Sequence, residues 1–196
     1  MEDHQILSKK SPFRYIALAL YVIALGVDIY EFVNELSGGT TFLYVNLALF
    51  IFDIVFGIFL IYGLIRRNLT ILNLLLIIFK VYDGTYYVVQ SLSSIDAGHI
   101  NTLDQVSSYL CVAAGVLSFI TLFFFSLHYY FEKKRFWFWV ENTMFLTGII
   151  LLAAVIISIC NITINQVRNS LFGEVLFMCI QTFAIYFVCL YVQDYE

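Results

Sequence analysis

Long apolar stretches and short polar segments alternate along the chain, and six of the stretches are more than 20 residues long. A helix of about 20 residues crosses the hydrocarbon core of a bilayer, which is roughly 30 Å thick. The pattern therefore predicts an all-α integral membrane protein, a bundle of six transmembrane helices that form three helical hairpins joined by short loops. The predicted spans are residues 14–36, 41–65, 69–92, 106–131, 136–162 and 170–192. We expect one transmembrane domain over residues 14–196, preceded by a cytoplasmic segment of residues 1–13.

The composition agrees with this pattern and excludes several classes of protein. Apolar residues make up 62% of the chain and charged residues 12%, whereas globular proteins carry about 25% charged residues. So few charges cannot cover the surface of a soluble domain, and a net charge of −4 offers nucleic acid no basic surface. A single proline in 196 residues indicates that most of the chain is uninterrupted helix. We expect the lipid bilayer as the surroundings of the chain, and no nucleic-acid partner.

Lysine and arginine mark one side of the predicted bundle. Segments that stay in the cytoplasm retain positive charge. Eight basic residues fall on the side of the two termini, whereas Arg168 falls on the opposite side. The eight are Lys9, Lys10, Arg14, Arg66, Arg67, Lys133, Lys134 and Arg135. We therefore expect both termini in the cytoplasm and the protein in the plasma membrane, by default the inner membrane of a bacterium.

Four charged residues fall at membrane depth, where each costs about 2.5 to 3.5 kcal/mol at the centre of a helix. They are Asp28, Asp53, Lys80 and Asp83. Helical spacing places each on a polar face of the first, second or third span, and Lys80 shares a face with Asp83. We predict that the three faces form a common polar interior, which is the candidate site.

The charges of this interior do not balance. One lysine cannot neutralise three aspartates, so the cluster needs a bound cation, protonated aspartates or a cavity filled with water. The alternative is a structural pair, in which Lys80 is joined to Asp53 or Asp83 and holds the helices in register without any ligand.

Weaker polar signals accompany this cluster. The secondary candidates are Asn46, Asn73, Gln90, Gln181, Glu141 and Glu174. Because Glu141 and Glu174 fall near the ends of their spans, where side chains reach water, we interpret both as solvated flanks. The fourth span has small residues on one face, which predicts a seam of close helix packing. The seam consists of Ser108, Cys111, Gly115 and Ser118.

Known motifs of catalysis and metal binding are missing from the sequence. The chain carries no HExxH zinc motif, no GxSxG serine motif and no glycine-rich phosphate loop. Its three histidines are scattered, and its four cysteines fall inside apolar stretches, where thiols commonly fill space between helices. We therefore name no catalytic residue, and we expect no cofactor and no bound metal.

Two functional classes fit these observations. The first is a transporter, channel or substrate-capturing membrane subunit, whose buried acidic and lysine site handles a proton, a small cation or a zwitterionic solute. The second is a membrane interaction, immunity or assembly subunit, whose buried charges pair with the helices of a partner protein. A second copy of the chain is a further candidate partner. We favour the first class, since ionisable residues inside a membrane are functional by default.

Overall fold

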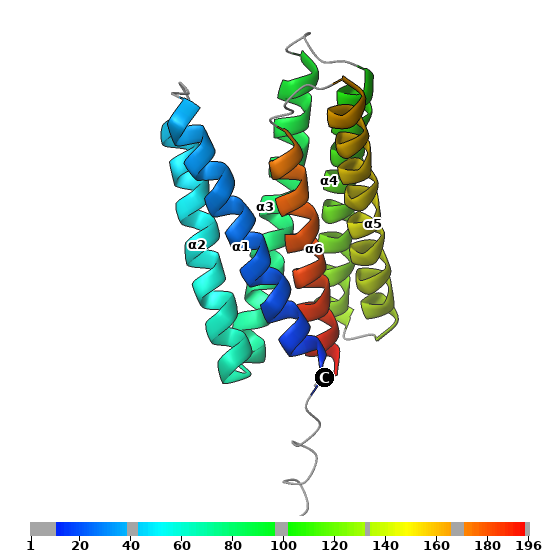
Figure 1. Cartoon of the computed structure of the whole chain (residues 1–196). Helices are drawn as coiled ribbons and strands as arrows, with labels where there is room; N and C mark the ends of the chain where they lie inside the picture. Colours follow the sequence, from blue (N-terminus) through cyan, green and yellow to red (C-terminus); the bar gives the residue numbers. More distant parts are fainter. Residues whose placement is uncertain (1–10, 39–42, 97–101, 132–133, 166–170, 195–196) are drawn as a thin grey trace, which may run out of the picture.

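Six helices make up the described part of the chain in the computed structural model (Figure 1). The structure describes residues 11–38, 43–96, 102–131, 134–165 and 171–194, without the side chains of residues 35–38, 43–46, 90, 93–96, 134, 165 and 171. The helices are α1 (Phe13–Gly38), α2 (Leu43–Arg66), α3 (Leu69–Asp96), α4 (Thr102–Phe131), α5 (Lys134–Asn165) and α6 (Leu171–Gln193). The predicted all-α class and the six long apolar helices are confirmed, and most helices extend a few residues beyond the predicted spans into the connections.

All six helices are long and apolar enough to cross a membrane. Large apolar side chains also point outward from the bundle. Ile58 on α2 is 61% exposed and Phe123 on α4 is 60% exposed. Such a surface would be unfavourable in water and is well suited to lipid, so the fold fits an integral membrane protein.

The helices pack in chain order around a ring, which α6 closes by packing between α5 and α1. The most extensive contacts are those of α4 with α5 and of α1 with α6, so the packing does not divide the bundle into three separate hairpins. Helix α6 also contacts α3 across the ring. In the apolar window of α6, 67% of the residues are buried, against 17% in α1. Helix α6 is therefore the central helix of the bundle.

Both ends of the described chain lie at the same end of the bundle (Figure 1). The Ser11 hydroxyl donates a 2.7 Å hydrogen bond to Asp194 Oδ2, which joins the start of α1 to the end of α6. The α2–α3 connection lies at this end too, where the Asn68 side chain accepts a hydrogen bond from the Ile71 amide at 3.1 Å. Asn68 thus caps the N-terminus of α3.

The small residues of α4 form the seam that their spacing predicts. Ser108, Cys111 and Ser118 are buried, and Gly115 lies against the backbone of α3. A Cβ on Gly115 would be 3.1 Å from the carbonyl oxygen of Gly84 and 2.8 Å from Val88 Cγ2. Only glycine allows α3 and α4 to approach so closely, which fixes the position of α3 beside the candidate site.

Candidate functional site

Asp53 lies inside the bundle on the buried face of α2. Phe56 and Leu60 follow it at helical spacing and are buried as well, so packing of this apolar stripe carries the carboxylate inward. Asp53 is 3% exposed. The Gln181 side-chain nitrogen of α6 donates to Asp53 Oδ1 at 3.2 Å, and the Tyr82 hydroxyl of α3 donates to Oδ2 at 3.4 Å. Asp53 thus links α2 to two further helices through neutral donors.

No lysine or arginine of the described residues forms an ion pair with Asp53. Its backbone carbonyl accepts a further hydrogen bond, at 3.3 Å, from the Tyr21 hydroxyl of α1. Burying an ionised carboxylate is expensive unless a positive charge compensates it. The neutral hydrogen bonds orient the carboxylate but leave its charge uncompensated.

Lys80 pairs with Asp83, one turn further along α3. Lys80 Nζ lies 3.4 Å from Asp83 Oδ2, and the two side chains are only 2% and 1% exposed. The sequence leaves Asp53 and Asp83 open as partners of Lys80, and the structure places Asp83 there. The other carboxylate oxygen, Asp83 Oδ1, is buried and makes no hydrogen bond to any described residue.

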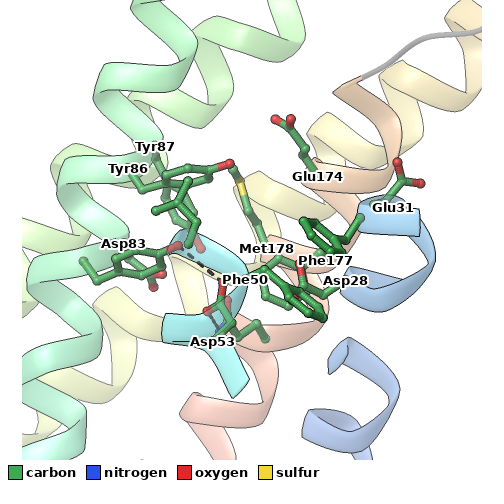
Figure 2. Close-up of a pocket in the computed structure, with 14 residues that line it drawn as sticks. Asp28, Glu31, Phe50, Asp53, Asp83, Tyr86, Tyr87, Glu174, Phe177 and Met178 are labelled. Carbon is green, nitrogen blue, oxygen red and sulfur yellow. Dashed lines mark hydrogen bonds between the residues drawn. The ribbon is translucent and has the colours of Figure 1, made fainter. Parts of the chain in front are cut away.

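A pocket with a volume of about 640 Å³, open mouth included, lies between α1, α2, α3 and α6 (Figure 2). Five acidic residues from these four helices line it: Asp28, Glu31, Asp53, Asp83 and Glu174. They come from the halves of the helices that are remote from the two termini (Figure 1). None of the described lining residues is basic. The pocket is therefore a strongly acidic cavity inside the bundle.

Aromatic rings form much of the remaining wall. Phe32 and Phe50 stack with their ring centroids 4.3 Å apart and their planes 4° from parallel. Tyr82 and Tyr86 stack at 5.6 Å. Tyr87 and Phe177 add two more rings, and the lining is completed by Leu49, Met178 and Gln181. The wall thus combines carboxylates with aromatic rings (Figure 2).

Close contacts with α6 hold this wall together. The Glu31 side chain of α1 packs directly on Gly173, so a side chain at position 173 would require Glu31 to move. On the other side, the Tyr87 hydroxyl of α3 lies 3.1 Å from Thr182 Oγ1. Helix α6 therefore positions residues of both α1 and α3.

The structure gathers some of the sequence-predicted site residues and separates others. Asp28, Asp53 and Asp83 line one pocket, and Lys80 is buried beside it as the partner of Asp83. Asn73 is buried on α3 and Glu141 is half-buried on α5, and neither is among the residues that line the pocket. The side chains of Asn46 and Gln90 lie outside the described residues.

The sequence analysis did not place α6 in the site, although residues of α6 line the pocket. Gln181 contacts Asp53, and Glu174, which we interpreted as a solvated flank, lines the pocket. Their spacing could have indicated a shared role, because Glu174 and Gln181 are seven residues apart and so fall on one helical face. Glu31 and Tyr82 also contribute to the wall and were not among the candidates.

Comparison of the chain with protein-family models, with curated proteins and with solved structures finds no match.

Proposed function

We propose that this protein is a membrane transporter, or a substrate-capturing membrane subunit, that takes a positively charged solute into the acidic pocket. The observation that carries the proposal is the lining of the pocket, to which four helices contribute five carboxylates and, among the described lining residues, no basic side chain. Lys80, the partner of Asp83, is not among the lining residues. Intramembrane carboxylates commonly mark the pathways of ions and substrates. A cation bound here would compensate charges that the described residues leave unbalanced.

Asp53 is the residue on which this function depends most. Lys80 is already engaged by Asp83, so the described residues supply no second cation for Asp53. The hydrogen bonds from Gln181 and Tyr82 fix the direction of its carboxylate. A preoriented carboxylate gains more from a cation than a mobile one, because less side-chain entropy is lost on binding.

The orientation of the protein is part of the proposal. Eight basic residues on the side of the termini favour a cytoplasmic position for that side, which would put the pocket in the outer half of the bundle, in the plasma membrane. Single cysteines at Gly39 or Gly98, in a chain without its native cysteines, should react with an impermeant thiol reagent added to intact cells. A cysteine at Asn68 should stay unlabelled, and its labelling from outside would contradict the orientation.

Binding is tested on the purified protein in mild detergent. We expect at least one cation among sodium, potassium, magnesium and small ammonium chlorides to raise the melting temperature of the wild type. The Asp53→Asn variant keeps the shape of the side chain and should lose this stabilisation. Glu141→Gln is the matched control, because Glu141 lies on α5 and is not in the pocket lining. If no cation stabilises the wild type more than Asp53→Asn, the proposed function is wrong.

Transport is measured after reconstitution into liposomes. The cation that stabilises the protein should enter liposomes that contain the wild type or Glu141→Gln, and should not enter those that contain Asp53→Asn. Binding without flux would identify a capturing subunit that depends on a partner for translocation.

The alternative role as an interaction or assembly subunit requires charges that a partner's helix can reach. Asp53, Lys80 and Asp83 are instead almost fully buried among helices of this chain. The alternative stays untested, and the pocket gives it less support than it gives the binding of a solute.

A further inference from the structure

We infer that the solute is an organic ammonium ion without a carboxylate, and that its charged head binds at the inner end of the pocket between Asp53 and Asp83. This inference rests on the proposed function of the pocket as a cation site. It narrows the solute from any proton, small cation or zwitterion to one chemical class.

The aromatic lining is the first observation. Six aromatic residues from α1, α2, α3 and α6 line the pocket: Phe32, Phe50, Tyr82, Tyr86, Tyr87 and Phe177. The face of an aromatic ring is electronegative and attracts a cation within about 6 Å of its centre, and sites for quaternary ammonium ligands are built from several such rings. A hydrated metal ion gains little from apolar rings, whereas the carbon atoms around an ammonium head pack well against them.

The distribution of the carboxylates favours a molecule over a bare ion. The five carboxylates are distributed over four helices. Among the described residues, no three His, Cys, Asp or Glu side chains are close enough to one another to hold a metal ion. Carboxylates spread in this way can instead face different parts of one larger cation.

The charge of the described lining is unfavourable for solutes with their own carboxylate. None of these lining residues is basic, so the carboxylate of an amino acid would meet only acidic and neutral groups among them. Lys80 does not change this, because it is paired with Asp83. Like charges brought together at low dielectric repel strongly. An amine without an acid group avoids this repulsion.

Two buried carboxylates point to the place of the ammonium head. Asp83 is fully buried and lines the pocket, and its Oδ1 makes no hydrogen bond to a described residue. Asp53 lines the same region and has only neutral partners. Figure 2 shows Asp53 and Asp83 near the aromatic groups of α3, with Phe177 and Met178 of α6 across the pocket. The head would sit between the two carboxylates and the organic body would extend along the rings and Met178.

The experiment compares choline and propylammonium with 3,3-dimethyl-1-butanol, which has the shape of choline and no charge. Binding to the purified protein in detergent is followed by the melting temperature, beside sodium, potassium and magnesium chlorides. We expect at least one of the two ammonium ions to stabilise the wild type well beyond the metal ions and beyond the neutral alcohol. This comparison uses only the wild type, so it does not depend on the folding of any variant.

Variants then test the role of the rings. Phe50→Leu and Phe177→Leu should each weaken the apparent affinity for the ammonium ion roughly 2- to 30-fold, the range that corresponds to one cation–π contact. Phe123→Leu is the matched control and should bind as the wild type does, because Phe123 is 60% exposed on α4 and outside the pocket. Asp53→Asn should weaken binding at least about tenfold, since removal of one compensating charge is worth more than about 1.4 kcal/mol.

The outcomes separate this inference from the proposed function. If metal ions stabilise the protein through Asp53 and the ammonium ions do not, the pocket is a cation site and the organic class is wrong. If the neutral alcohol stabilises as well as choline, the charge of the solute is irrelevant and the inference is overturned. If no cation of either kind acts through Asp53, the proposed function itself fails, and this inference fails with it.

Discussion

The α4–α5 interface and the pocket between α1, α2, α3 and α6 bury polar groups in opposite ways. Between α4 and α5 the groups are mainly hydroxyls, and they bond to each other. Ser107 Oγ lies 3.1 Å from Ser158 Oγ, and Thr121 Oγ1 donates to Thr143 Oγ1 at 2.8 Å. One helical turn from Ser107 and Ser158, the Asn161 side chain of α5 donates to Asp104 Oδ1 of α4 at 2.7 Å. Most of these polar contacts are therefore between neutral groups.

The pocket side concentrates charge instead. It holds five carboxylates and one buried lysine, and the helices leave an open volume between them. A hydroxyl can donate to and accept from its neighbour, so a pair of hydroxyls satisfies itself. A carboxylate only accepts and carries a net charge, so several of them need something further. Buried polar groups that are neutral can therefore join two helices without a ligand. Buried groups that carry a net charge mark a candidate binding site.

The largest effect is expected when the ion pair of Lys80 with Asp83 is broken. Lys80→Ala leaves Asp83 buried without its partner, which should lower the free energy of unfolding by about 3 to 5 kcal/mol. The double variant Lys80→Met with Asp83→Asn removes both charges and keeps the side-chain volume, so it should recover most of the stability. Thermal and denaturant unfolding in detergent measure both effects.

The same two variants distinguish a structural pair from a functional one. If the double variant recovers stability and loses cation binding, the pair belongs to the site. If the double variant has the stability and the cation binding of the wild type, Lys80 and Asp83 serve only the structure. Asp83 would then no longer be a proposed binding residue. A Lys80→Ala variant as stable as the wild type would contradict the pairing itself.

An intermediate effect is expected at the seam between α3 and α4. Gly115→Leu forces a side chain into the space that the Gly84 carbonyl and Val88 occupy, and overpacking of this kind costs about 1 to 3 kcal/mol. Gly26→Leu is the matched control, because a Cβ at Gly26 meets nothing within 4 Å. In unfolding measurements in detergent, Gly115→Leu should therefore be less stable than Gly26→Leu, although the substitution is the same. Equal stability of the two variants would argue against the close approach of α3 and α4.

The smallest effect is expected among the hydroxyls of the α4–α5 interface. Ser107→Ala removes a hydrogen bond between two neutral groups, and such bonds contribute about 0.6 kcal/mol on average in membrane proteins. The melting temperature should fall slightly, and stabilisation by cations should not change. Loss of cation binding in this variant would mean that the two sides of the bundle are coupled, and that the division between them is wrong.

The sequence predicts the helices and the three polar faces well, because both depend on local spacing. A helical period brings Lys80 and Asp83 to one face whatever the neighbours are, and the structure shows them in contact. The contact between Asp53 and Gln181 joins residues 128 positions apart. It depends on which helix packs beside which, and apolar periodicity carries little of that information.

Helix α6 shows most clearly that the sequence pattern does not reveal which helices pack together. Its residues are buried on nearly all sides, so the spacing of Glu174 and Gln181 does not by itself show which helices their face meets. Tyr82 was missed for a related reason, because a tyrosine in an apolar stretch is indistinguishable from packing until its hydroxyl is seen to donate to Asp53.

The position of Gln181 also sets an order of events on the ribosome. Helices α1, α2 and α3 are synthesised before α6, so Asp53 enters the membrane well before its glutamine partner exists. Lys80 and Asp83 are one turn apart on a single helix, and each can therefore shield the other as soon as α3 inserts. Lys80 and Asp83 can therefore enter the membrane as a self-contained pair, whereas Asp53 gains its hydrogen bond from Gln181 only after α6 has been made.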